Sequence, residues 1–449
     1  MAAFLARPAA LLLLLTPALL QAASFDVATE YRMRALSYTN LNLNADIVNN
    51  HAFISQRARL GFALKDIQLA ERGGEPQTME VAVRLHAVGV AGSTTPFQPP
   101  FDRIADHYPN AAFIPFIENA YAKVRNLACG NFDMTFGRQN ASLGSGLLLD
   151  DDGAGMTGVS AAGGLPWLGM KGQAFVLQAA NRQAGANNLD VYGFSVDVPG
   201  EVVWQFHQLI EKDRAARTLA VNGCAGGCPI SRATRYFSSL RYQLHYGPMV
   251  FDGEAALERG SAEPAAPATD KIKFNGNAEV MRAKWKQPLW GQTQGIVRMS
   301  LARGSGDDTS TPFIDEAFFP SSGHRFDGLE RSGFGEFFAA TPYDAFGGQS
   351  TATATGLQAG ASGIVIVGLG VTPPAYHGIV LDLDYYLFQV ERNLGHQRTL
   401  GTETDLRLRY DAGDRFSIRA SAALFTIGTA SNPTQGAARR YMLEAFGRF

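Results

Sequence analysis

The chain ends on Arg439-Arg440-Tyr441-Met442-Leu443-Glu444-Ala445-Phe446-Gly447-Arg448-Phe449, and this stretch decides the fold that we expect. From Tyr441 onward every second residue is apolar or glycine, whereas Arg440, Glu444 and Arg448 lie on the alternate positions. Alternation with a period of two predicts a β-strand that has one apolar and one polar face. A final strand that ends on an aromatic residue is typical of the closing strand of an outer-membrane barrel, which pairs with the first strand and removes both sheet edges.

The amino-terminal 23 residues have the pattern of a secretory signal peptide. Arg7 precedes the apolar run Leu11–Leu15, and the small residues Ala22 and Ala23 follow. The run is too short for a membrane-spanning helix and Pro17 follows it closely, so cleavage after Ala22 or Ala23 is expected. We therefore expect residues 1–23 to be a signal peptide and residues 24–449 to form one exported barrel domain.

The composition limits the class of protein further. The chain has 449 residues, of which 48 are glycine, and its 29 phenylalanines outnumber its 14 tyrosines and 4 tryptophans together. The 39 basic and 41 acidic residues nearly balance, so no nucleic-acid partner is expected. No second apolar run reaches the length of a transmembrane helix. No fixed repeat of about 20–50 residues is visible, which counts against a soluble solenoid or propeller.

Alternating segments separated by turn residues recur along the whole chain and predict eighteen strands. They are 25–33, 54–62, 80–87, 119–125, 132–139, 156–162, 172–180, 190–198, 201–211, 235–245, 249–258, 277–285, 295–302, 360–371, 379–386, 402–410, 416–427 and 439–449. The expected fold is an all-β, transmembrane antiparallel barrel of about 18 strands, which crosses the outer membrane of a Gram-negative bacterium many times.

Because the number of strands is even, both termini lie on one side of the membrane, which we expect to be the periplasm. The connections after odd-numbered strands are then external and mostly long, with 303–358 the longest, and most of the others are tight turns. The turn at 65–78 does not fit this pattern. Either it is a real periplasmic excursion or the strand count is wrong there.

The charged strand faces indicate the lining of a channel. In a membrane barrel the apolar face meets lipid, so the charged face must meet the lumen, and a barrel of this size leaves an aqueous channel. The expected lining residues are Arg32, Arg34, Arg57, Arg59, Arg84, Arg125, Arg235, Arg241, Arg298, Arg407, Arg409, Arg419, Glu403 and Asp405. Many of these charges could instead pair across the wall and hold the barrel round. We expect the arginines of the first four strands to form a positive stripe that faces few acids and favours anions.

Five short motifs resemble the bacterial alginate-export porin family, in the same order along the chain. They are Gln56-Arg57-Ala58-Arg59-Leu60-Gly61-Phe62, Gly137-Arg138-Gln139, Ser305-Gly306-Asp307-Asp308, Glu316-Ala317-Phe318-Phe319-Pro320 and Leu400-Gly401-Thr402-Glu403-Thr404-Asp405-Leu406. The resemblance implies an eighteen-stranded barrel whose positive lumen passes an anionic polysaccharide such as a polyuronate. The segments 205–235 and 325–358 match nothing in that family. Simple alternation would aim Arg138 at lipid unless a bulge at Gly137 turns it inward.

The other candidate sites favour ordinary structural roles. In an oxidising compartment Cys224 and Cys228 are expected to form a loop disulfide, which leaves Cys129 over. A metal site there would need further ligands, and no haem-attachment motif occurs. The run 150–152, three aspartates, is more typical of a solvated acidic loop than of a calcium site. The eight histidines are scattered and no nucleophile–base set stands out, so we expect no enzyme, cofactor or metal.

The sequence therefore predicts a passive outer-membrane channel for anionic polysaccharide or small anionic solutes. Alternatives are a barrel that sheathes a partner electron-transfer cytochrome, or a general diffusion porin. Expected partners are outer-membrane lipid, the barrel-assembly machinery that reads a terminal aromatic residue, the anionic solute or polymer, and periplasmic export proteins. The connection 303–358 contains the pairs Phe318-Phe319 and Phe337-Phe338, and we expect it to fold into the mouth or lumen and narrow the pore.

Overall fold

The structure is a computed structural model, and the fold is defined for most of the chain. It describes residues 23–40, 50–72, 75–92, 113–127, 131–151, 155–179, 189–219, 221, 223–224, 227–290, 293–308, 310–321, 333–339, 361–393, 397–430 and 437–449. Cys129, Asp152, all of the expected signal peptide except Ala23, and much of the connection 303–358 lie outside these ranges. Among the described residues no helix is long and apolar enough to cross a membrane.

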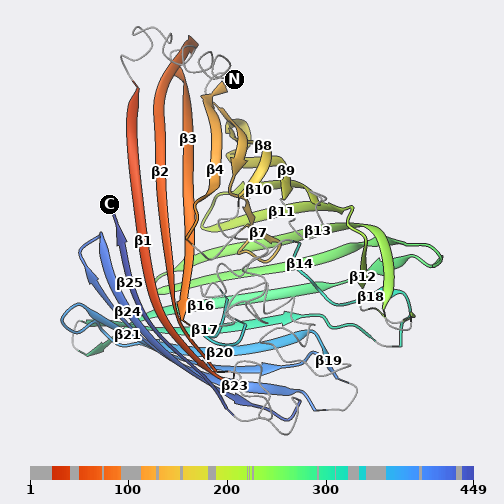
Figure 1. The fold of residues 1–449 in the computed structure, drawn as a ribbon. Coiled ribbons are helices and arrows are strands. Elements are labelled where there is room, and N and C mark those ends of the chain that lie inside the picture. Colours follow the sequence, from red (N-terminus) through yellow and green to blue (C-terminus); the bar gives the residue numbers. More distant parts are fainter. Residues whose placement is uncertain are drawn as a thin grey trace.

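Within these ranges eighteen antiparallel strands close into a barrel (Figure 1). They are β1 (Ser24–Thr39), β2 (His51–Arg72), β3 (Glu75–Gly92), β4 (Phe116–Asn126), β5 (Phe132–Gln139), β8 (Met156–Leu165), β9 (Met170–Ala179), β10 (Leu189–Val198), β11 (Val202–Asp213), β13 (Cys228–Tyr246), β14 (Met249–Pro264), β16 (Asn277–Trp290), β17 (Thr293–Gly304), β20 (Ile364–Thr372), β21 (Ile379–Gln389), β23 (Thr399–Ala412), β24 (Phe416–Ile427) and β25 (Ala438–Arg448). Each of the eighteen predicted segments overlaps one of these strands, so the predicted fold class is confirmed.

The remaining elements are short and lie in the connections. They are β6 (Ser142–Leu143), β7 (Leu149–Asp150), the 3-10 helix η2 (Pro166–Leu168), β12 (Arg217–Leu219), β15 (Ile272–Phe274), β18 (Ile314–Asp315), β19 (Ala361–Ser362) and β22 (Arg392–Asn393).

The last strand closes the barrel against the first. β25 pairs with β1 from Arg439 opposite Thr39 to Arg448 opposite Glu30. Beyond the strand, Phe449 donates its backbone N–H to the Thr29 carbonyl at 2.8 Å and accepts the Thr29 N–H at 2.9 Å. The carboxy-terminal residue therefore takes part in the seam that removes the two edges of the sheet.

The distribution of side chains is inverted relative to a soluble protein. Phe194, Leu369 and Leu443 point outward and are 44%, 57% and 56% exposed, whereas Arg34 and Glu403 on the opposite face are 4% and 0% exposed. A closed barrel with an apolar exterior and a charged interior suits a bilayer, because closure lets neighbouring strands pair their backbone polar groups within the wall. The protein is a multi-pass outer-membrane β-barrel.

The turn at 65–78 is a long hairpin rather than an error in the strand count. β2 and β3 remain paired as far as Arg72 opposite Glu75, with register shifts after Leu64 and after Gln68. β1 begins opposite Lys65, so the hairpin extends beyond the rim at that edge, at the top of Figure 1.

Gly137 of β5 has a backbone conformation that other residues rarely adopt. Its φ is +116°, and a Cβ atom there would lie 2.3 Å from the backbone oxygen of Ala120 in β4, so only glycine fits. The next residue, Arg138, is half-buried and donates from Nε to the Glu118 carbonyl at 3.2 Å. The local distortion therefore gives Arg138 a backbone acceptor on the neighbouring strand.

Candidate permeation pathway

The connection between β5 and β8 folds into the barrel. Leu147, Leu148 and Leu149 have no exposed surface, and the tip is fixed to β14 by Ser145, whose N–H and hydroxyl both donate to Glu254 Oε2 at 2.7 Å. Arg241 of β13 adds a hydrogen bond to the Gly144 carbonyl at 3.4 Å. This segment, 140–151, therefore occupies part of the lumen.

The acidic run at 150–152 belongs to this segment, and the expectation of a solvated loop is wrong for Asp151. Asp151 is 3% exposed and its Oδ2 accepts the Gly155 N–H at 3.1 Å. The carboxylate is buried because it closes the turn that carries the inserted leucines, and burial of a carboxylate requires such partners.

The described part 310–321 of the long connection is held inside the barrel by Arg235. Arg235 is 5% exposed and lies 2.7 Å from Glu211 and 3.1 Å from Glu258. The same guanidinium donates to the Phe319 carbonyl at 3.0 Å and to the Ser321 carbonyl at 3.4 Å. Arg235 thus points inward as expected, but it anchors the connection and does not face open lumen.

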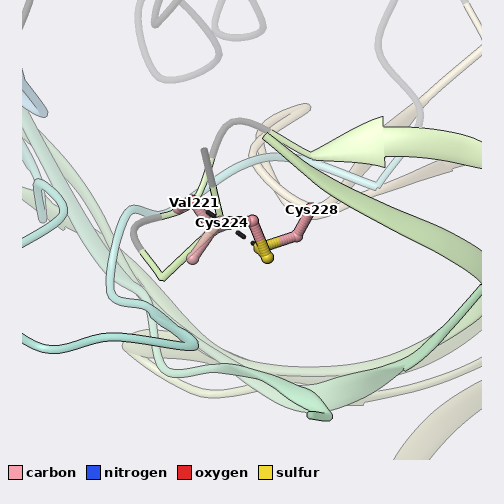
Figure 2. Close-up of a disulfide and its surroundings, with 3 residues drawn as sticks. All are labelled: Val221, Cys224 and Cys228. Carbon is pink, nitrogen blue, oxygen red and sulfur yellow. Dashed lines mark hydrogen bonds between the residues drawn. A yellow bond between two sulfur atoms is a disulfide. The ribbon is translucent and has the colours of Figure 1, made fainter. Parts of the chain in front are cut away.

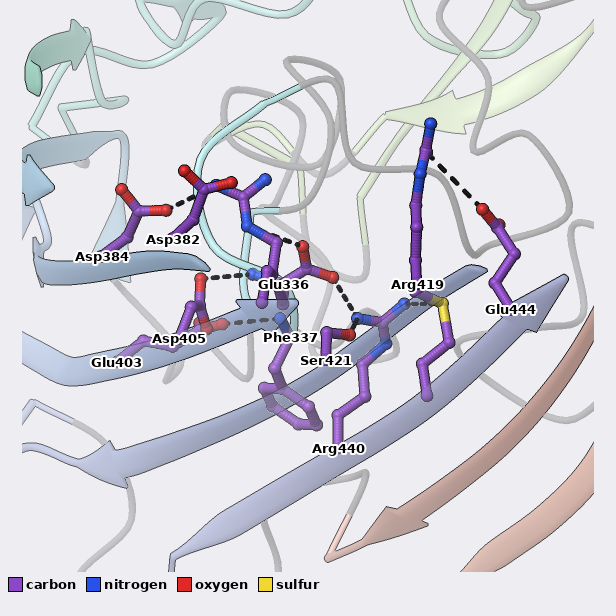
Figure 3. A network of polar contacts seen from close by, with 12 residues as sticks. Glu336, Phe337, Asp382, Asp384, Glu403, Asp405, Arg419, Ser421, Arg440 and Glu444 are labelled. Atoms are coloured by element: carbon purple, nitrogen blue, oxygen red, sulfur yellow. Dashed lines mark hydrogen bonds and ion pairs between the residues drawn. The ribbon is translucent and has the colours of Figure 1, made fainter. Parts of the chain in front are cut away.

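The described part 333–339 is fixed to the opposite wall by two carboxylates of β23 (Figure 3). Glu403 accepts the backbone N–H groups of Phe337 at 2.6 Å and Phe338 at 2.8 Å, and Asp405 accepts that of Glu336 at 3.0 Å. Both carboxylates have no exposed surface. Glu403 and Asp405 therefore anchor the connection and are covered by it.

Aromatic packing completes this attachment. The Phe338 ring lies 4.8 Å from that of Phe388 and 4.9 Å from that of Phe425, both on the inner wall. Phe337 contacts Tyr38 at 6.5 Å between ring centroids, and Arg440 pairs with Glu336 beside it. The described parts of the connection 303–358 thus fold inside the barrel, as the paired phenylalanines predicted.

The arginines of the first strands lie around a glutamate that sequence alternation missed. Glu118 of β4 is fully buried, 2.8 Å from Arg59, 3.6 Å from Arg84 and 3.0 Å from Nδ1 of His86. Alternation aims Glu118 at lipid, but the register between β3 and β4 shifts after Arg84, and this bulge turns the carboxylate inward. No feature of the sequence marked the bulge.

A second glutamate has the same role at the seam. Glu444 of β25 lies 2.5 Å from Arg34 and 3.5 Å from Arg419, and further along the wall Arg125 pairs with Glu80 at 2.5 Å. The expectation that the stripe faces few acids therefore needs correction, because glutamates lie among its arginines. Arg59 also lies 3.5 Å from Glu30, so Arg34, Arg59, Arg84 and Arg419 share three carboxylates.

The exposure of the arginines separates two groups. Arg84, Arg125, Arg409 and Arg419 have side chains that are 42%, 43%, 48% and 49% exposed. Arg32, Arg34 and Arg57 are 3%, 4% and 6% exposed. The side chains of the first group are therefore accessible to solvent, and those of the second are buried in the wall.

Arginines of β13, β17 and β23 form ion pairs with aspartates of nearby strands. Arg241 contacts Asp252 through two N–H groups at 2.8 Å each. Asp384 lies 2.9 Å from Arg298 and 2.6 Å from Arg407, whose side chain is 30% exposed. For these arginines the structure shows pairs that hold the barrel wall together.

Cys224 and Cys228 form a disulfide beside Val221 (Figure 2). Cys228 belongs to a buried apolar cluster with Val221, Ile230, Ala262 and Ile272, on the inner face of the extended strands. Phe313, directly before β18, packs against this cluster. The disulfide thus closes a small core at the base of the inserted connection.

Comparison with known proteins shows that this chain resembles several solved structures in its fold. No family model and no curated protein matches the chain. Among solved structures, OccAB1 of Acinetobacter baumannii has a TM-score of 0.57 at 9% identity, over 95% of this chain and 96% of that chain. OccK2 (OpdF) of Pseudomonas aeruginosa in complex with glucuronate has a TM-score of 0.53 at 12% identity, over 95% and 98%. OccK5 (OpdH) of the same organism has a TM-score of 0.50 at 11% identity, over 94% and 98%.

These proteins are outer-membrane porins with an 18-stranded barrel. At such low identity the likeness establishes the fold alone. It does not show the alginate-export family that the short motifs suggested.

Proposed function

We propose that the protein is a passive outer-membrane channel that favours small anionic solutes. The observation that carries this proposal is that four arginines, Arg34, Arg59, Arg84 and Arg419, share the three carboxylates of Glu30, Glu118 and Glu444. Arginine stays protonated at any working pH, so the surplus positive charge on this wall is permanent. Arg84 and Arg419 are the exposed members of these four, and they are the side chains that a passing solute would meet.

The inserted connections support small solutes over a polymer. Segments 140–151, 310–321 and 333–339 pack inside the barrel, and Ser321 donates its N–H to the Leu148 carbonyl at 3.0 Å, which joins two of them. An alginate-like polysaccharide would have to thread past these segments. A sheath for a cytochrome would need the space that they fill.

The glucuronate complex of OccK2 supports a carboxylate-bearing sugar as the solute class. Guanidinium groups bind carboxylates through paired N–H donors, and weak, multiple sites permit transit. Glucuronate is therefore the first probe for the channel. A general diffusion porin would show no preference for it over an uncharged sugar of similar size.

The proposal is tested by reversal potentials of the purified barrel in planar bilayers under a KCl gradient. The wild-type channel should prefer chloride, and Arg84→Glu with Arg419→Glu should shift the preference toward potassium. The shift should shrink at high salt, because the screening length falls from about 10 Å at 0.1 M to about 3 Å at 1 M.

The control is Arg415→Glu, which reverses one arginine charge at an exposed turn between β23 and β24. It should leave the reversal potential close to that of the wild type. Cation preference in the wild-type channel would refute the proposal.

A further inference from the structure

On the outward face of β10, β11, β13 and β14, residues that are paired across the strands form rows. The chemical type of the side chains differs from one row to the next. Phe194, Gln208, Ser238 and Leu257 occupy one register row, and Phe194 and Leu257 are 44% and 49% exposed. These two side chains belong to the apolar belt. Outward positions two residues further along lie about 7 Å away, toward the edge that carries the long connections.

The next row contains aromatic side chains. Tyr192, Ile210, Tyr236 and Arg259 are paired across the same four strands. Tyrosines at this position are typical of the boundary between lipid chains and headgroups. This row therefore marks the edge of the bilayer on the long-connection side.

Cations follow directly beyond the tyrosines. Lys212, Thr234, Ser261 and Lys273 form the next register row, across β11, β13, β14 and β15. Lys212 and Lys273 are exposed, and Nζ of Lys212 lies 5.2 Å from the centre of the Tyr192 ring. Within the described part of the chain, neither lysine contacts a carboxylate.

Arg259, in the tyrosine row, also lacks an acidic partner within the described residues. Its Nη1 donates to the backbone carbonyls of Glu258 at 2.6 Å and Gly276 at 3.0 Å. Asp190 of β10 completes the lysine row opposite Lys212, and its carboxylate pairs with Arg214 at 2.7 Å. Beyond this row, Lys271 pairs with Glu263 at 2.8 Å. We call Lys212, Arg259 and Lys273 the basic collar.

We propose that the basic collar binds the phosphate groups of a phosphorylated glycolipid of the outer leaflet, of the lipopolysaccharide type. Lysine and arginine near a membrane surface attract anionic headgroups, and the exposed Phe194 and Leu257 below the collar contact the acyl chains of the same molecule. A free phosphate ion would use only the cations, so the continuity with the apolar belt selects a lipid. This proposal is independent of the solute, and it places the long-connection edge at the outer leaflet.

The disulfide-bonded core stiffens the collar from behind. The inward neighbours of the lysine row include Ala233, Ala262 and Ile272, which are 3%, 0% and 0% exposed. They belong to the apolar cluster that contains Cys228. Because the sheet is packed on its inner face, the collar is held in place before the lipid arrives, and less ordering entropy is lost on binding.

The test measures binding of lipid A to the purified barrel in detergent by native mass spectrometry. Lys212→Gln, Arg259→Gln and Lys273→Gln together should weaken binding by roughly fivefold per cation, or on the order of a hundredfold in all. The control combines Lys65→Gln, Lys171→Gln and Arg415→Gln, which remove three cations near the opposite edge. It should change binding by less than about twofold. Heat-modifiable migration verifies that both variants fold.

Two further ligands separate the possible sources of the phosphate. Lipid A without phosphates should bind the wild-type barrel as weakly as lipid A binds the collar variant. Inorganic phosphate at the same concentration should not displace lipid A. Equal binding of the dephosphorylated lipid, displacement by inorganic phosphate, or equal losses in the collar variant and its control would each overturn the proposal.

Discussion

The Glu118 carboxylate lies 2.8 Å from the Arg59 guanidinium, at a position that strand alternation assigns to lipid. The carboxylate has no exposed surface, and Arg84 and His86 lie within 3.6 Å and 3.0 Å of it. A buried charge of this kind persists only with such partners. Glu118 therefore controls both the packing and the net charge of the arginine wall.

Glu118→Gln should make the channel more selective for anions. The substitution keeps the shape of the side chain and removes one negative charge beneath Arg59 and Arg84. The reversal potential should move toward that of chloride, most strongly at low salt. Glu30→Gln is the control, because Glu30 is 35% exposed and lies 3.5 Å from Arg59, so its field is more screened. A larger shift in reversal potential for Glu30→Gln than for Glu118→Gln would contradict the conclusion that Glu118 controls the net charge of the arginine wall.

Strand positions could be predicted because the alternation of apolar and polar residues survives wherever two strands keep their register. Glu118 could not be placed, because it lies at a register shift between β3 and β4 that turns it inward. The contact of Arg138 could not be predicted either, because the backbone of the preceding Gly137 is irregular. At Gly137 the glycine gave a hint, which the +116° φ bears out. At Glu118 the sequence gave none, because the shift arises from pairing between β3 and β4.

Of the two connections that fold inside the barrel, the sequence predicted this placement for only one. The paired phenylalanines of 303–358 indicated a segment that avoids water, and the described parts do so. The segment 140–151 was missed because its aspartates suggested a solvated loop. The run Leu147-Leu148-Leu149 just before them was the available sign. Which carboxylates receive each segment, such as Glu254 or Glu403, depends on contacts between distant strands that the sequence alone does not specify.

Release of the segment 333–339 should widen the channel. In Glu403→Ala with Asp405→Ala, three backbone N–H groups lose their acceptors, at a cost of roughly 1–3 kcal/mol for each group that stays buried. The segment should then leave the wall more often, and single-channel conductance should rise. Asp411→Ala, at a rim carboxylate that is 47% exposed, is the control and should leave conductance unchanged. An unaltered conductance in the double variant would place the segment outside the conduction path.

Two variants at Phe449 should distinguish the contribution of its aromatic ring to assembly from that of its backbone hydrogen bonds. Deletion of Phe449 removes both the aromatic side chain and the two hydrogen bonds to Thr29, whereas Phe449→Ala removes only the ring. If the exposed ring is what the assembly machinery recognises, both variants should show less folded barrel in the outer membrane. Heat-modifiable migration of membrane extracts measures the folded fraction. If Phe449→Ala gave the wild-type amount of folded barrel and only the deletion reduced it, the backbone hydrogen bonds of the seam, and not the ring, would account for the loss.

The segment 310–321 should be held less firmly as the pH rises. Asp315 lies in the connection between β17 and β20, outside the membrane-spanning strands. Burial, together with the nearby Glu258 and Asp307, raises the pKa of Asp315 to about 7, although the hydrogen bond from the Ala317 N–H and the charge of Arg235 act in the opposite direction. In an undocked segment the pKa would be close to its ordinary value of about 3.9. Docking is therefore most favourable at low pH and weakens as the pH rises from about 4 to about 7, with no further change above that range.

The expected result is more frequent or larger current fluctuations at pH 7.5 than at pH 5, because the docked segment then carries a buried negative charge. Asp315→Asn should give the same low fluctuation level at both pH values, since the amide does not ionise. Asp308→Asn is the matched control on the same connection, where hydrogen bonds from Ser310 lower the pKa of an exposed carboxyl. That variant should keep the wild-type pH response. A pH response that persists in Asp315→Asn would assign the effect to another group.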